Sequence, residues 1–150
     1  MKKILSILIA LIVLGAVAAL ALIYVPFKPT PANEALAADW KAEAGRGEYV
    51  MRASDCMACH TAKGGEPMAG GRGIDSPMGT IWSSNITPDK ETGIGNWTLE
   101  QFRAAMVDGI GGHGQQLYPA MPYENYRFMK ESDIRALFDY LQAEVKPVRN

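Results

Sequence analysis

The sequence predicts a fold of helices and irregular loops, with one membrane-spanning helix at the N-terminus and one small domain after it. Three observations support this prediction. Residues 4–24 carry no charged side chain, and residues 98–108 and 132–145 place apolar side chains at helical spacing. Residues 63–96 are instead rich in Gly, Pro, Ser, Thr and Asn, which favour turns and loops.

The N-terminal segment is expected to be a membrane anchor over residues 1–25. Its 21 uncharged residues, 4–24, are long enough as a helix to cross a hydrocarbon core of about 30 Å. Lys2 and Lys3 precede them, so the N-terminus is expected in the cytoplasm and the residues from Lys28 onward on the outer side of the membrane, the periplasm. The alternative is a cleaved signal peptide, whose apolar run is normally about 7 to 15 residues. A possible cleavage site at 35–37 lies well beyond the apolar run, which favours an uncleaved anchor.

Residues 26–37 are predicted to be a tether between the anchor and the domain. This segment combines three prolines with Thr, Ala and Asn, a composition typical of an extended linker. Residues 38–150 then form one small domain. All 16 acidic residues but only 12 of the 15 basic residues lie from Glu34 onward, which leaves a net charge of −4 there. This modest acidity argues against a nucleic acid as partner.

The domain is expected to begin with a helix over residues 40–53 that leads into C-x-x-C-H at residues 56–60. Cys56 and Cys59 lie on the same side of one helical turn, where both thiols can bond to the vinyl groups of a haem. His60 follows directly and can bind the iron as proximal ligand. The motif therefore predicts one covalently attached haem c.

A zinc site, a thioredoxin-like redox pair and a structural disulfide are alternative interpretations of this cysteine spacing. The sequence has no further cysteine, and its one other histidine is His113, so zinc would lack ligands. A thioredoxin-like pair would be expected within alternating strands and helices, which this sequence lacks. These two interpretations are therefore weaker than haem, and a disulfide stays open.

Residues 63–96 predict irregular loops that wrap around the cofactor. Residues 98–108 are the clearest helix of the domain, because Thr98 and Gln101 have capping-box spacing and Gly109 ends the pattern. The last helix is expected over residues 132–145, with a stripe of core residues and a proline two residues later.

Met121 is the predicted distal ligand of the haem iron. It lies between Pro119 and Pro122, which hold the backbone extended and can present the thioether from a rigid loop. The alternative is that Met121 fills an apolar gap, as methionines usually do. Met68, Met78 and Met129 lie in predicted loops or at a helix entrance, so composition leaves them open as candidate ligands. His113 is a further candidate, but its four neighbouring glycines suggest a mobile surface turn.

The chain resembles a class I cytochrome c, and more narrowly the membrane-anchored cytochrome c subunits of bacterial periplasmic alcohol, aldehyde and sugar dehydrogenases. Three stretches carry the resemblance: 47–61 (GEYVMRASDCMACHT), 79–101 (GTIWSSNITPDKETGIGNWTLEQ) and 117–123 (LYPAMPY). The resemblance implies an all-α fold, thioethers at Cys56 and Cys59, and His60 and Met121 as axial ligands. Two departures are the single C-x-x-C-H motif, where many members have three, and Lys130, where the family usually has Thr or Ser before the last helix.

The resemblance implies an electron carrier and not an enzyme. Such a subunit accepts electrons from the catalytic subunit of a periplasmic dehydrogenase and passes them to a respiratory acceptor. Two alternatives are a cytochrome c subunit of a terminal oxidase or reductase, and a haem peroxidase or sensor with an open distal site. The second alternative is weaker, because a five-coordinate iron has no need of the segment around Met121.

Overall fold

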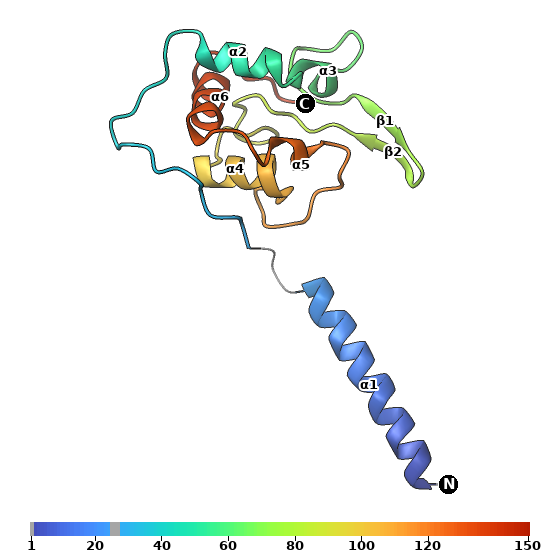
Figure 1. Cartoon of the computed structure of the whole chain (residues 1–150). Coiled ribbons are helices and arrows are strands. Elements are labelled where there is room, and N and C mark those ends of the chain that lie inside the picture. The colour runs from blue at the N-terminus through green and yellow to red at the C-terminus, as the bar shows by residue number, and fades with distance from the viewer. Residues whose placement is uncertain (1, 25–27) are drawn as a thin grey trace.

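The computed structural model describes residues 2–24 and 28–150, and it contains six helices and two strands within them (Figure 1). The first and last residues of the predicted anchor, and the first two of the predicted tether, lie outside the described residues. In chain order the elements are α1 (Lys2–Tyr24), α2 (Arg46–Ala53), α3 (Cys56–His60), β1 (Gly73–Ser76), β2 (Gly79–Trp82), α4 (Leu99–Asp108), α5 (Tyr123–Tyr126) and α6 (Glu131–Ala143).

Helix α1 is long and apolar enough to cross a membrane. Its window Lys2–Leu22 has a mean hydropathy of 3.0, and no part of that window is buried against the rest of the protein. The exposed side chains are large and aliphatic, and water solvates them poorly. This helix therefore fits either a membrane anchor or a signal peptide by its length and composition.

Helices α2, α4 and α6 surround the core of the domain. The side chains of Met51, Val107 and Leu137 are almost fully buried in it, and the rings of Phe102 and Phe138 are 5.2 Å apart between α4 and α6. Gly47 allows α2 and α6 to cross closely. A Cβ atom there would overlap the backbone oxygen of Ala136 and the Cβ of Tyr140.

The ends of α4 confirm the capping signals in the sequence. The Thr98 hydroxyl accepts from the Gln101 backbone N–H at 3.2 Å, and the Gln101 side chain accepts from the Thr98 N–H at 2.8 Å. Gly109 follows in the left-handed conformation, with φ of 65°. Lys130 precedes α6 and makes no side-chain cap, as expected for a residue without a short hydroxyl side chain.

Two segments differ from the prediction. The first helix of the domain begins at Arg46 and not at residue 40, because Gly45 takes a left-handed conformation with φ of 75° and the preceding residues are irregular. The strands β1 and β2 pair as an antiparallel hairpin within the predicted loop 63–96. The expected all-α fold is therefore confirmed only in part.

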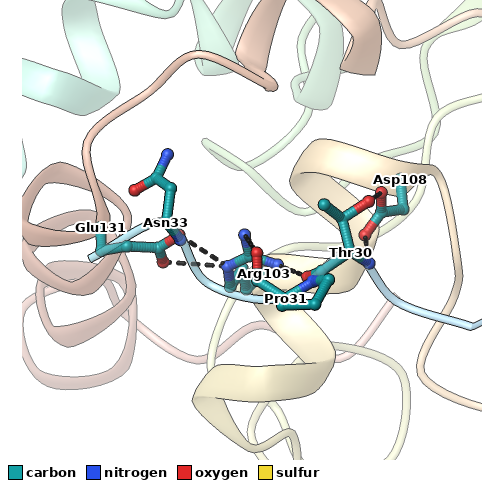
Figure 2. Close-up of polar contacts among 6 residues, drawn as sticks. All are labelled: Thr30, Pro31, Asn33, Arg103, Asp108 and Glu131. Carbon is teal, nitrogen blue, oxygen red and sulfur yellow. Dashed lines mark hydrogen bonds and ion pairs between the residues drawn. The ribbon is translucent and has the colours of Figure 1, made fainter. Parts of the chain in front are cut away.

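Residues 30–33, within the predicted tether, lie against the domain, and we refer to them as the docked strap. Figure 2 shows Arg103 between this strap and Glu131. The Arg103 guanidinium donates to the backbone oxygens of Thr30 and Pro31, and its Nε lies 2.9 Å from both Glu131 oxygens. The Thr30 N–H donates to Asp108 at 2.8 Å. These contacts tie the strap to α4 and α6.

Candidate functional site

Cys56, Cys59 and His60 all lie on α3, a single helical turn after α2. The backbone reverses between the two helices at Asp55, which has φ of 54°. A left-handed backbone conformation is rare for residues other than glycine, and here it ends α2 and precedes α3. The sequence prediction that both thiols and the imidazole share one turn is met by this geometry.

The two thiols are free and differ in exposure. Cys56 is half-buried, whereas Cys59 is exposed. Burial raises the pKa of the Cys56 thiol to about 11, so that side chain stays protonated at neutral pH. A thioredoxin-like nucleophile or a zinc thiolate needs the opposite shift. In residues 2–24 and 28–150, moreover, no group of three or more His, Cys, Asp or Glu side chains is placed to hold a metal ion.

The imidazole of His60 has one nitrogen engaged and the other available. Its Nδ1 lies 2.7 Å from the backbone oxygen of Ser84, and because a carbonyl only accepts, Nδ1 must donate. Burial lowers the pKa of His60, which favours the neutral ring. The remaining nitrogen, Nε2, therefore carries a lone pair, as a metal ligand requires.

Glycine allows the segment that carries the Ser84 carbonyl to lie next to α3. The Gly70 N–H donates to the His60 backbone oxygen at 2.8 Å, and Gly70 has φ of +76°. A Cβ at Gly70 would lie 2.5 Å from the carbonyl carbon of Ser84 and 2.6 Å from the backbone nitrogen of Asn85. Only glycine leaves this space for the partner of His60.

Arg72 bonds to the backbone of α3, and Tyr126 bonds to the backbone of Ser54 just before α3. The Arg72 guanidinium donates to the Ala58 backbone oxygen at 2.5 Å, which satisfies a carbonyl near the end of α3. The Tyr126 hydroxyl of α5 donates to the Ser54 backbone oxygen at 3.0 Å. Burial is the main cause of the raised pKa of Tyr126, so this hydroxyl remains a donor.

Met121 lies in the loop that leads into α5. Its side chain is half-buried, and its backbone oxygen accepts from the Tyr123 N–H at 2.8 Å in a tight turn. Leu117 N–H donates to Gly109 at 2.7 Å, so the loop is also attached to the end of α4. Tyr126 connects the same helix, α5, to Ser54 at the end of α2. His113, by contrast, is exposed in a glycine-rich turn.

Sequence reasoning identified the thiols and the imidazole but not Ser84, Arg72 or Tyr126. The contribution of Ser84 is a backbone carbonyl, which any residue provides, so no side-chain pattern marks it. Arg72 contacts the backbone of α3 at Ala58, and Tyr126 contacts the backbone of Ser54 just before it; nothing in their local sequence indicates these partners. Such contacts become visible only when the chain is folded.

The comparisons with known proteins point to one family, and a cytochrome c family model matches residues 44–143. The chain is 49% identical to the fructose dehydrogenase cytochrome subunit of Gluconobacter japonicus, over 82% of this chain and 24% of that protein. It is 56% identical to the alcohol dehydrogenase (quinone) cytochrome c subunit of Gluconobacter oxydans, over 69% of this chain and 22% of that protein.

The chain is also 50% identical to the gluconate 2-dehydrogenase cytochrome c subunit of Pantoea cypripedii, over 69% of this chain and 23% of that protein. It spans about a quarter of the length of these three relatives. The family model, in contrast, covers most of the domain that contains the C-x-x-C-H motif. The chain therefore belongs to the cytochrome c family.

Proposed function

We propose that this chain is a membrane-anchored electron-transfer subunit whose domain, residues 38–150, carries one haem c. Cys56 and Cys59 would hold the haem through thioethers, and His60 and Met121 would bind its iron. The observation that carries this proposal is the hydrogen bond between His60 Nδ1 and the Ser84 oxygen, because it leaves Nε2 free to bind iron. Cytochromes c bind their haem covalently, and the thiols on α3 have the spacing for that bond.

The chemistry that haem supplies is the transfer of one electron at a time between ferric and ferrous iron. The residues of this chain determine what else the site can do. With His60 and Met121 both bound to the iron, water, peroxide and gases would have no open position on it. A thioether ligand also raises the reduction potential relative to a second nitrogen ligand. Both effects favour electron transfer without chemistry on a substrate.

The relatives suggest the electron donor. Their names describe cytochrome subunits of fructose, alcohol and gluconate dehydrogenases. We infer that a dehydrogenase catalytic subunit delivers electrons to this haem, and that a respiratory acceptor receives them. Residues 1–25 hold the protein in the bacterial inner membrane, residues 26–37 connect the anchor to the domain, and the domain faces the periplasm.

Absorption spectroscopy of the purified full-length protein tests the ligand set. A near-infrared band from methionine sulfur bonded to ferric iron is expected in the wild type and in Met78→Ala, since Met78 is 83% exposed on the hairpin. The band is expected to vanish in Met121→Ala. If the wild type lacks the band and its reduced form binds carbon monoxide rapidly, the distal site is open. The proposed function is then wrong, and a peroxidase or sensor is the better proposal.

Isolation of the complex from native membranes tests the partner. Co-purification with a dehydrogenase subunit, together with haem reduction on addition of that enzyme's substrate, is the expected result. Co-purification with a terminal oxidase or reductase instead would keep the electron-transfer role and replace the proposed donor.

A further inference from the structure

A buried polar cluster lies directly after Ser84, the residue that holds His60. Thr87 is fully buried, and Asn85 is only 8% exposed. The side-chain oxygen Oδ1 of Asn85 accepts from the Thr87 N–H at 2.9 Å and lies 2.7 Å from the Thr87 hydroxyl. The Asn85 amide donates to the Thr92 hydroxyl at 2.9 Å and to the Val148 backbone oxygen at 2.7 Å. Both donors and both lone pairs of this amide are therefore used.

Residues 148–150 close this cluster from outside. The Thr87 hydroxyl accepts from the Val148 N–H at 3.1 Å. Asn150 donates through its backbone N–H to the Thr92 hydroxyl at 3.1 Å, and through its side chain to the Ala69 backbone oxygen at 2.7 Å. The C-terminal segment thus joins the loop 85–92 to the segment that contains Gly70. We refer to Asn85, Thr87, Thr92 and residues 148–150 as the brace.

The brace meets His60 at one peptide group. The Ser84 carbonyl belongs to the peptide group that links Ser84 to Asn85, so the hydrogen bonds that hold Asn85 restrict the movement of this carbonyl. On the opposite side, Gly70 packs against the same peptide, and the Ile86 N–H donates to the Met68 backbone oxygen at 2.9 Å. The Ser84 oxygen therefore has little freedom to move away from His60 Nδ1.

We propose that Asn85 and Thr87 are positioning residues that set the hydrogen bond and the ring orientation of His60, and through them the reduction potential of the haem. This inference rests on the proposed role of His60 as the proximal ligand. A strong hydrogen bond at Nδ1 makes Nε2 a better electron donor, which stabilises ferric iron. A looser brace weakens that bond, so the reduction potential rises.

Thr87→Val is the decisive variant, because valine has the shape of threonine but lacks the hydroxyl. Thr87→Ser is its matched control, since serine keeps the hydroxyl and adds no charge. Redox titration of the full-length protein gives the potential, and proton NMR of the oxidised protein gives the haem methyl shifts, which depend on the orientation of the axial ligands. At the wild-type midpoint, the ratio of reduced to oxidised Thr87→Val is expected to rise about threefold. Thr87→Ser is expected to match the wild type.

A lower melting temperature for Thr87→Val, with unchanged potential and unchanged methyl shifts, would show that the brace only stabilises the fold and would overturn the proposal. If Thr87→Val does not fold, Asn150→Ala removes the outermost contact of the brace and is expected to move both readouts in the same direction by less. No change in either readout for Asn150→Ala would then overturn it. If the wild type lacks the near-infrared band from methionine sulfur, the proposed function itself is contradicted. That result is distinct from the outcomes for Thr87→Val and Asn150→Ala.

Discussion

Arg103 and Glu131 form an ion pair in which Nε lies 2.9 Å from both carboxylate oxygens, with side chains only 12% and 8% exposed. The same guanidinium donates to the backbone of the docked strap, and Glu131 accepts from the Asn33 N–H at 3.2 Å. The pair therefore connects three parts of the chain, namely α4, α6 and residues 30–33. Because residues 30–33 are bound to the domain, a retained anchor would be joined to it by a shorter segment than the predicted tether 26–37.

Arg103→Ala is expected to lower the free energy of unfolding by about 3 kcal/mol, because it leaves a buried carboxylate without its partner. Denaturant unfolding measures this loss, and limited proteolysis near residues 28–46 should detect the released strap. Arg52→Ala is the matched control, since Arg52 pairs with Glu48 on the surface, where the side chains are 66% and 45% exposed. Its loss is expected to be below about 1 kcal/mol. Equal losses for the two variants would contradict a structural role for the buried pair.

The N-terminus of α6 lacks a side-chain cap. Lys130 stands at the cap position with extended backbone, φ of −66° and ψ of 144°, and makes no cap hydrogen bond. Lys130→Ser is expected to add about 1 kcal/mol to the free energy of unfolding, because a serine hydroxyl accepts from a free N–H of the first turn. Thr98→Ala at the capped α4 is expected to lose about the same amount. A thermal unfolding series of the two variants checks both signs, and no gain from serine would show that the first turn of α6 is already satisfied.

Acid should destabilise the loop 85–92 through Asp89. Its carboxylate accepts from the backbone N–H and hydroxyl of Thr92 and from the N–H of Glu91, and the backbone bond from Thr92 is the main reason that its pKa is lowered. A lowered folded-state pKa contributes stability above the unfolded value of about 3.9, and this contribution is lost as the pH falls through the folded value. Asp89→Asn should remove that part of the dependence, as unfolding curves between about pH 5 and pH 2 would show. The same pH dependence in the wild type and in Asp89→Asn would contradict a stabilising role for the Asp89 carboxylate.

The parts of the structure that sequence predicted well are those with local signals. The capping residues Thr98 and Gln101 lie three apart, and Gly109 ends the same helix, so α4 could be placed to within one residue. The C-x-x-C-H motif likewise specifies its own helical turn. Short-range hydrogen bonds of this kind depend on residues that are neighbours in sequence, which is why a pattern reveals them.

The contacts that the sequence does not predict join residues that are distant in sequence, or involve backbone atoms that every residue has. Glu131 is 28 residues from Arg103, and the strap is more than 70 residues from it. The sequence predicts a loop where the hairpin lies, because glycine begins both strands and each strand is only four residues long. The partner of His60 is a carbonyl 24 residues away, and a carbonyl has no sequence signature. Met121 stays a prediction as the distal ligand.

Alanine substitutions at Gly64 and Gly70 separate the cost of backbone strain from the cost of steric overlap. Both glycines have left-handed backbone, with φ of +76° and +75°, but a Cβ at Gly64 would meet nothing within 4 Å, whereas one at Gly70 would overlap the Ser84 and Asn85 backbone. Gly64→Ala is expected to cost about 1 kcal/mol from backbone strain alone. Gly70→Ala is expected to cost about 3 kcal/mol, because strain is added to steric overlap. It should also move the Ser84 oxygen away from His60, so its reduction potential should rise while that of Gly64→Ala stays at the wild-type value. Equal unfolding free energies and equal potentials for the two variants would mean that the close approach of Gly70 does not control the histidine.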